Sequence, residues 1–258
     1  MESAQRYAGI ARELAGTSFA AIAYVESTVS TNEDAAARLG DAGRGGLTIV
    51  AEHQTGGMGR KGRSWLAPPG TGLLCTTILP SPLPARDLWI VPFWCALAVA
   101  QALRDNGIET LLHWPNDLLL SDAKLAGILC TSRVAGDVAR VACGVGVNVH
   151  RWAGARTEVV PPPAFCDDVA PVERAALLRA LLQQYEATLP LLHNPQRVAR
   201  MWEAQAHLPG KRYRILKDGE LSSFEATALG LSTGGALLVR RDDGARETIS
   251  LADARALR

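Results

Sequence analysis

The sequence lacks a strong charge of either sign, a long apolar run and an N-terminal signal peptide. Its 258 residues carry 27 Lys and Arg against 26 Asp and Glu, and a net charge of +1 gives no overall field that would attract nucleic acid. No run is long and apolar enough to span a bilayer, and residues 1–7 lack the apolar core of a signal peptide. These absences argue against a nucleic-acid or membrane protein and predict a cytoplasmic one.

The sequence also lacks paired cysteines and clustered metal ligands. Its five cysteines are an odd number without a Cys-x-x-Cys pair, so we expect reduced, packed thiols. The five histidines show no metal-ligand spacing, and we interpret them as surface or structural residues. No Ser/His/Asp or Cys/His combination stands out, so the sequence predicts neither a metal site nor a catalytic nucleophile.

Helical and strand-like segments are mixed throughout residues 1–208. Helix signals are clearest at 87–105, where Pro92 comes early and Gly107 follows the end. The pattern predicts an α+β domain. The predicted helices cover 2–15, 87–105, 173–189 and 195–208, and the predicted strands cover 21–25, 47–51, 73–79, 111–120, 124–131 and 138–149.

The pattern changes near Pro209 and Gly210. Four short strands follow, separated by glycine turns and by no helix, which is typical of a small antiparallel barrel. We therefore predict two domains, residues 1–208 and 209–258, which 258 residues can form. The four predicted strands cover residues 212–216, 224–231, 236–241 and 247–251.

Residues 54–65 form the most informative stretch, Gln-Thr-Gly-Gly-Met-Gly-Arg-Lys-Gly-Arg-Ser-Trp. Its glycines let the backbone approach a ligand closely, and its cations, with no carboxylate nearby in sequence, can bind phosphate or carboxylate oxygens. Trp65 adds a flat apolar face for a heterocycle. Because two predicted strands hold the stretch, we favour an anion site over a solvated basic loop.

Residues 26–34 connect a predicted strand to a predicted helix. Ser30, with Glu33 three residues later, fits a capping box for a helix that continues to Gly40. Capping alone accounts for Ser30, Thr31 and Asn32 in this segment, and it is favoured here over a ligand-binding turn.

Two further segments carry polar residues among apolar ones. Pro115 interrupts the strand at 111–120 and would turn Asn116 and Asp117 toward a cavity. Lys124 opens an apolar strand, and its ammonium group reaches either water or an anionic ligand, with neither favoured. Glycines 144 and 146 within a strand indicate that something approaches the backbone closely, but the context excludes a dinucleotide fingerprint.

Together these segments resemble the biotin protein ligases. The blocks Ser30–Asn32, 54–65, Trp114–Asp117 with 124–128, and 144–148 occur in that family's order, from about residue 20 onward. The resemblance implies an α+β, class II synthetase-like domain whose mixed sheet carries helices on one side. It also implies that residues 209–258 form an SH3-like barrel.

The resemblance implies a two-step reaction that uses biotin, ATP and Mg²⁺. The biotin carboxylate attacks the α-phosphate of ATP to give biotinyl-5′-AMP, and a lysine of a biotin carboxyl carrier protein then attacks this anhydride. Cations would offset the repulsion between carboxylate and polyphosphate in the first step. The carrier supplies the nucleophile of the second step, which agrees with the lack of one in this sequence.

The resemblance also assigns site residues. Asp117 would orient Lys124, bind Mg²⁺ through water or assist the acceptor amine, and these roles stay open. Gly144 and Gly146 would allow the close approach of ligand. The implied biotin-binding residues are Ser30, Thr31, Asn32, Gln54, Gly56, Met58, Gly59, Arg60, Lys124 and Gly127; the adenylate-binding residues are Arg60, Arg63, Trp65, Asn116, Lys124 and Asn148; the catalytic residues are Lys124, Arg60 and Asp117.

The sequence departs from the family pattern at two positions. Met58 stands where the family loop has arginine, and His113 stands where a lysine precedes Trp-Pro-Asn-Asp. Loss of a charged hydrogen bond at Met58 is expected to weaken retention of the adenylate by about 1.5–3 kcal/mol. Because Arg60, Arg63 and Lys124 are present, we expect activity to persist.

Bifunctional family members carry a winged helix-turn-helix before the catalytic domain. Only about twenty residues precede the first matching block here, so we expect a ligase that does not repress transcription. Partners would be biotin, ATP and the carrier protein, without nucleic acid or membrane, and a homodimer is left open.

Three other functions compete with the ligase. A lipoate or octanoate transferase belongs to the same wider superfamily, but the basic, glycine-rich stretch 54–65 and its Trp65 argue against it. Met58 and His113 motivate a degenerate module that binds biotin or adenylate without catalysis. A nucleic-acid binder agrees least with the near-neutral charge.

Overall fold

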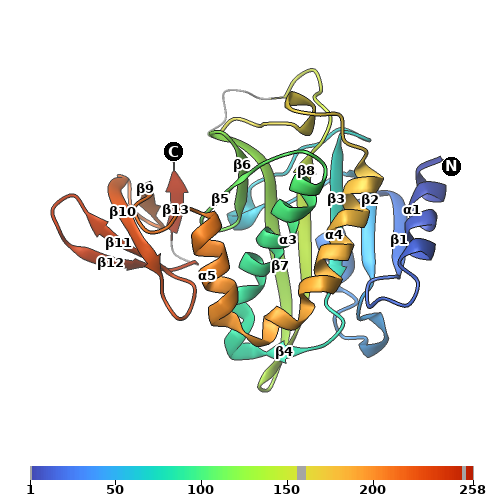
Figure 1. The fold of residues 1–258 in the computed structure, drawn as a ribbon, viewed down its shortest axis with the longest axis horizontal. Helices are drawn as coiled ribbons and strands as arrows, with labels where there is room; N and C mark the ends of the chain where they lie inside the picture. Colours follow the sequence, from blue (N-terminus) through green and yellow to red (C-terminus); the bar gives the residue numbers. More distant parts are fainter. Residues whose placement is uncertain (1, 156–160, 252–253, 258) are drawn as a thin grey trace.

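A mixed β-sheet forms the centre of the computed structural model, which describes residues 2–155, 161–251 and 254–257 (Figure 1). The strand order is β1-β2-β3-β8-β7-β6-β5, with β4 beside β8. Only β1 and β2 pair in parallel among these described strands, so the predicted mixed sheet is confirmed. The strands are β1 Ile22–Thr28, β2 Thr48–Gln54, β3 Gly72–Ile78, β4 Leu83–Pro84, β5 Leu111–His113, β6 Asp117–Leu120, β7 Ala123–Ala135 and β8 Val138–Asn148.

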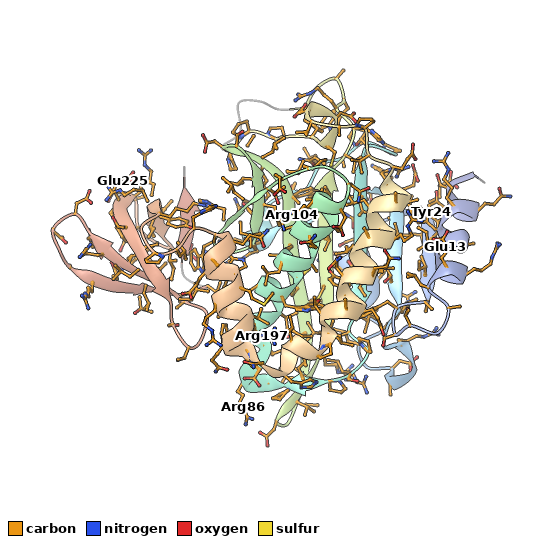
Figure 2. All side chains as sticks on the ribbon, viewed as in Figure 1. Glu13, Tyr24, Arg86, Arg104, Arg197 and Glu225 are labelled. Carbon is orange, nitrogen blue, oxygen red and sulfur yellow. The ribbon has the colours of Figure 1, made fainter. Side chains whose placement is uncertain are left out.

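Three long helices pack on one face of this sheet: α1 Glu2–Glu13, α3 Val91–Asp105 and α4 Arg174–Thr188 (Figure 1). Their apolar side chains share one core with alternate strand residues such as Val50 and Cys143. Charged side chains such as Glu13, Arg86 and Arg197 project from the outside (Figure 2). These helices thus cover one face of the sheet.

The opposite face carries α2 (Thr31–Ala36). Ile49 and Ala142 are next in sequence to Val50 and Cys143, so their side chains point to this opposite face. There they pack against Ala35 of α2. Helices on one side are therefore confirmed for α1, α3 and α4 but not for α2. The prediction that the helix would continue to Gly40 is also wrong, because regular α-helix ends at Ala36 and turns follow.

The stretch Ala85–Asp105 combines the 3₁₀ turn η3 (Ala85–Ile90) with α3, and it is long and apolar enough to cross a membrane by length and composition. The prediction that no such run exists is therefore wrong. However, 61% of its most apolar window is buried inside the fold. Its apolarity is that of a core helix that packs against the sheet and beside α4 (Figure 1).

A second, antiparallel sheet follows α5 (Pro195–Gln205), which itself follows the turn η5 (Leu189–His193). We call this C-terminal sheet the C-terminal module; its strand order is β12-β11-β10-β9-β13. The sequence prediction missed the last of its strands. The strands are β9 Arg212–Lys217, β10 Phe224–Leu231, β11 Leu237–Arg241, β12 Arg246–Ile249 and β13 Ala254–Leu257.

The C-terminal module shares its core with the larger sheet. The indole Nε1 of Trp114 donates to the carbonyl of Gly235 at 3.4 Å, and the Glu203 carboxylate of α5 accepts from the Leu231 amide at 2.6 Å. A Cβ on Gly235 would lie 2.7 Å from the Trp89 ring, so the glycine turn packs directly on the helical layer. These contacts hold the module firmly beside β5 and α5.

Candidate active site

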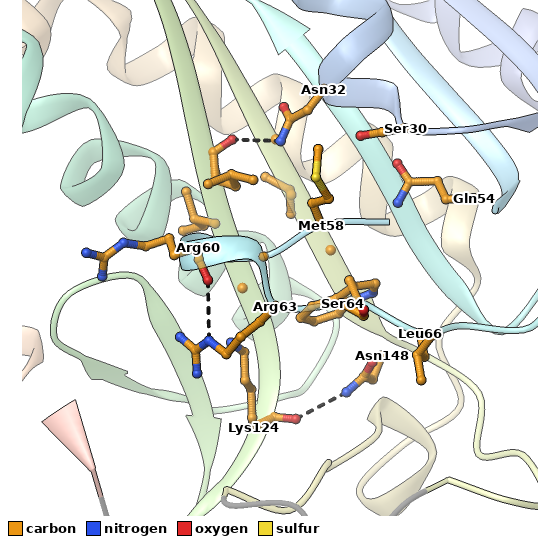
Figure 3. Close-up of a pocket in the computed structure, with 18 of the residues that line it drawn as sticks. Ser30, Asn32, Gln54, Met58, Arg60, Arg63, Ser64, Leu66, Lys124 and Asn148 are labelled. Atoms are coloured by element: carbon orange, nitrogen blue, oxygen red, sulfur yellow. Dashed lines mark hydrogen bonds between the residues drawn. The ribbon is translucent and has the colours of Figure 1, made fainter. Parts of the chain in front are cut away.

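A cavity of about 390 Å³ opens beside the start of α2, over strands β2, β3, β7 and β8. It brings together residues from all of the segments that the sequence singled out. Figure 3 shows neutral polar side chains such as Ser30, Asn32 and Gln54 at one end and the side chains of Arg63 and Lys124 at the other. The cavity is therefore bipolar, and we call its two parts the neutral end and the cationic end.

The neutral end is a network of mutually oriented side chains. The Gln54 Oε1 atom accepts from the backbone amide of Thr31 at 2.8 Å and from its hydroxyl at 2.9 Å. Thr76, fully buried on β3, donates to the Thr31 hydroxyl at 2.8 Å. Asn32 donates its amide to the Leu129 carbonyl of β7 at 3.1 Å. These bonds fix donors and acceptors before any ligand arrives.

Ser30 has a different role from the predicted one. It is the N-cap residue of α2 by backbone conformation, but its side chain makes no capping hydrogen bond. The side chain is 2% exposed and lines the cavity with Thr31 and Asn32. The interpretation of these three residues as capping alone is therefore wrong.

The basic loop, residues 57–65, is a closed hairpin. The Trp65 amide donates to the Gly57 carbonyl at 2.8 Å, and the Gly59 amide donates to the Arg63 carbonyl at 2.6 Å. The 3₁₀ turn η2 (Arg60–Gly62) forms its tip, where Lys61 adopts a left-handed φ of 58°. Such a conformation is uncommon for residues other than glycine and needs support from neighbouring contacts.

The indole of Trp65 lies on a platform made by Gly127 and Gly146, which pair directly across β7 and β8. A Cβ would lie 2.7 Å from the ring at Gly146 and 3.0 Å from it at Gly127. A Cβ at Gly144 would overlap the Asn32 amide. In this structure the glycines make room for the protein's own side chains, and Gly144 and Gly146 also line the cavity.

Lys124 forms the centre of the cationic end. Its ammonium Nζ lies 2.7 Å from the Asp117 carboxylate and 5.6 Å from the centre of the Trp65 ring. Asn148 donates to the Lys124 carbonyl at 3.2 Å (Figure 3). Asp117 itself lies outside the cavity wall and contacts the ligand-facing residues through this ion pair with Lys124.

Arg60 lies at the edge of the cationic end. One nitrogen donates to Asn116 at 3.3 Å, and the other donates to the Leu251 carbonyl of the C-terminal module. Burial lowers the pKa of Arg60, and the nearby Asp117 carboxylate opposes this effect. Guanidinium groups stay protonated in proteins, so the side chain keeps its charge.

The hairpin β5–β6 corrects the prediction of one interrupted strand at 111–120. Pro115 lies in the turn between two antiparallel strands, and Asn116 there lines the cavity while its amide donates to the Ile128 carbonyl at 2.8 Å. His113 is buried on the other side, with its ring 4.8 Å from that of Tyr213. The histidine that replaces the family lysine is therefore a structural residue outside the cavity wall.

Most of the site residues inferred from sequence lie in the cavity wall; Gly56 and Asp117 do not. Gly56 packs behind the wall, since a Cβ there would lie 2.9 Å from Val29. Thr76 was missed, although its pairing with Gly144 across β3 and β8 follows from strand register. The wall residues that sequence reasoning did not assign are Ser64, Leu66, Cys75, Thr76, Ile128, Leu129, Val145, Trp152, Ala155, Pro161, Pro163 and Phe165.

Carboxylates are absent from the described part of the cavity wall. Likewise, no group of three or more His, Cys, Asp or Glu among the described residues could hold a metal ion. The wall therefore suits a ligand with a neutral hydrogen-bonding end and an anionic end.

Residues 24–148 match the model of the biotin/lipoate A/B protein ligase family. The biotin–[acetyl-CoA-carboxylase] ligase of Paracoccus denitrificans is 32% identical over 242 residues, 88% of this chain and 96% of that protein. The corresponding ligase of Mycobacterium tuberculosis is 33% identical over 219 residues, 78% of this chain and 76% of that protein.

The bifunctional ligase/repressor BirA of Bacillus subtilis is 28% identical over 212 residues, which cover 80% of this chain and 65% of that protein. The chain thus spans just under two thirds of that relative. The solved structure of biotin protein ligase from Aquifex aeolicus in complex with biotin and ATP superposes with a TM-score of 0.72 at 23% identity, covering 92% of this chain and 99% of that one. This last likeness shows the shared fold.

Proposed function

The chain belongs to the biotin protein ligase family. On this premise we propose that it converts biotin and ATP into biotinyl-5′-AMP and pyrophosphate, and then passes the biotinyl group to a lysine of a carrier protein. The observation that carries the proposal is the bipolar cavity, in which a hydrogen-bonding end and a cationic end face one ligand. Biotin has this division, with a polar, uncharged ureido ring and a carboxylate.

The neutral end suits the ureido ring. This ring presents two N–H donors and one carbonyl acceptor, and the side chains of Ser30, Asn32 and the Thr31–Gln54 pair can satisfy both kinds. The positions of Thr31 and Gln54 are already set by their bonds to each other and to Thr76, and Asn32 is held by its bond to Leu129. Little ordering entropy is therefore lost when biotin binds.

The cationic end suits the first chemical step. A biotin carboxylate oxygen attacks the α-phosphorus, and the bond to the bridging oxygen breaks so that pyrophosphate leaves. Lys124 and Arg63 line this end, with Lys124 held by Asp117, and they offset the charge that two anions bring together. Trp65 and Asn148 border the same end and would hold the nucleotide.

Mg²⁺ fits the cationic end only when it is bound to ATP, because it would then neutralise phosphate oxygens. The described cavity wall has no carboxylate, and Asp117 is engaged with Lys124, so phosphates and water would be its ligands.

The second step needs an outside nucleophile. The amine of a carrier lysine attacks the biotinyl carbonyl carbon, and AMP leaves with the electron pair of the broken bond. Cys75, the thiol in the cavity wall, does not compete, because burial raises its pKa far above the ordinary value and keeps it protonated.

The proposal includes the division of the chain into a catalytic domain, residues 1–208, and an SH3-like domain, residues 209–258. The separate strand order of the C-terminal module supports it. We also assign Met58, Gly59 and Gly127 to the biotin side of the site, as residues that line the cavity.

The test is the intact mass of a biotin carboxyl carrier domain after incubation with this protein, biotin, ATP and Mg²⁺. We expect a gain of one biotinyl group that disappears when ATP is omitted. Because the matching family model also covers lipoate ligases, parallel reactions contain lipoate or octanoate instead of biotin. Preferential transfer of either would contradict the assignment of biotin.

A further inference from the structure

Lys61, at the tip of the basic loop, contacts the C-terminal module. Its Nζ lies 2.6 Å from each carboxylate oxygen of Asp218, in the connection between β9 and β10. The Lys61 side chain is only 19% exposed, although it lies outside the cavity wall. The pair joins residues that are 157 positions apart in the chain.

A second contact reinforces the first. Arg60, the residue before Lys61, donates to the backbone carbonyl of Leu251, which follows β12. Two successive loop residues therefore hold two separate segments of the C-terminal module. One of the two, Arg60, also reaches Asn116 in the cavity wall.

The two sides of this contact differ in how firmly they are held. The C-terminal module is anchored by Trp114, Glu203 and the packing of Gly235 on Trp89. The loop is rich in glycine and carries a left-handed Lys61, and within the loop two backbone bonds, Trp65 to Gly57 and Gly59 to Arg63, close the hairpin. The module is therefore the more firmly anchored side of this contact.

We propose that Lys61 and Asp218 are a positioning pair by which the C-terminal module holds the basic loop over the cationic end of the cavity. The inference rests on the proposed function and deepens it. Neither residue lines the cavity, so the pair acts through Arg63 and Trp65, which do. Loosening it lets the anionic adenylate leave sooner.

The first experiment is limited trypsin digestion of the full chain, followed by mass spectrometry of cleavage after Arg63. Asp218→Ala removes the carboxylate, and Asp242→Ala is the matched control, because Asp242 pairs with Arg212 at 2.5 Å in the same module. We expect about two- to fivefold faster cleavage in Asp218→Ala, in keeping with the modest strength of partly exposed ion pairs, and no change in the control.

The charge-swapped variant Lys61→Asp/Asp218→Lys tests the pairing itself. We expect cleavage after Arg63 to return toward the wild-type rate. Equal cleavage of Asp218→Ala and Asp242→Ala would overturn the proposal. So would a swapped variant with wild-type melting temperature that is cleaved as fast as Asp218→Ala.

The second experiment measures release of preformed biotinyl-5′-AMP. We expect Asp218→Ala to raise the release rate by about two- to fivefold, with adenylate formation at saturating substrates little changed, and the swap to reverse the effect. Unchanged release would overturn the role in retention. If the wild-type protein makes no adenylate, the proposed function fails, whereas the trypsin experiment still decides whether the pair holds the loop.

Discussion

The two ends of the cavity are built in different ways. The neutral end is built on helix α2 and the neighbouring strands, and its buried residues Thr31 and Thr76 bond to one another. The cationic end combines a strand lysine, a glycine hairpin and contacts from the C-terminal module. The neutral end can therefore select by shape, whereas the cationic end depends on contacts between segments that are far apart in the chain.

The largest effect is expected at the cationic end. Lys124→Ala removes a charge that borders the cavity and leaves Asp117 without its partner. A charged hydrogen bond is worth about 1.5–3 kcal/mol, so we expect adenylate formation to fall by about 10- to 150-fold. Pyrophosphate release at saturating biotin and ATP measures this fall.

The control for Lys124→Ala is Lys217→Ala, which removes a lysine paired with Glu247 in the C-terminal module. It should form adenylate normally. Wild-type pyrophosphate release by Lys124→Ala would contradict the assigned role, as would an equal loss in both variants.

A smaller effect is expected at the neutral end. Gly144→Ala places a methyl group against the Asn32 amide, and overpacking of this kind costs about 1–3 kcal/mol. Calorimetry should show biotin affinity reduced by about tenfold or more, with ATP affinity less affected. Gly9→Ala is the control, since a Cβ there meets nothing within 4 Å. Unchanged biotin binding would mean that Asn32 does not contact biotin.

Replacing Met58 with arginine is expected to improve retention of the adenylate. The side chain lines the cavity and is 44% exposed, and Met58→Arg would add a cation there. We expect release of biotinyl-5′-AMP to slow severalfold, measured by chasing labelled adenylate with unlabelled adenylate. Met58→Leu, which adds no charge, should release it as the wild type does. An unchanged rate in Met58→Arg would place this position outside the reach of the ligand's charge.

The smallest effect concerns pH. Burial raises the pKa of Cys75 well above its ordinary value of 9.0, so this thiol stays protonated in the folded protein when it has begun to ionise in the unfolded chain. Its contribution to stability is thus complete below pH 9 and declines as pH rises further. At pH 9 we expect iodoacetamide to leave Cys75 unmodified in folded protein and to alkylate it in urea. Rapid alkylation of folded protein would contradict the burial.

The resemblance to biotin protein ligases, which rests on short local motifs, assigned most residues of the neutral end and the loop from sequence alone. Gln54 and Ser30 come from short motifs, and strand patterns near them place both at the same edge of the sheet. Burial also explains the error at Ala85–Asp105, since an apolar core helix and a membrane helix have the same composition.

The contacts across the chain could not be predicted. Asp218 and Leu251 reach the loop only because the C-terminal module packs beside β5, and no local pattern records that packing. The capping role inferred for Ser30 is wrong for a similar reason, since the cavity that its side chain faces is built by distant strands.

The most direct test of the two-ended cavity is biotin-dependent exchange of labelled pyrophosphate into ATP, with biotin concentration varied. We expect exchange by the wild-type protein only when biotin is present. Gly144→Ala should raise the biotin concentration needed for half-maximal exchange, and Lys124→Ala should lower the maximal rate. Exchange without biotin would contradict the two-ended cavity. So would an equal change in both variants, whether in the half-maximal biotin concentration or in the maximal rate.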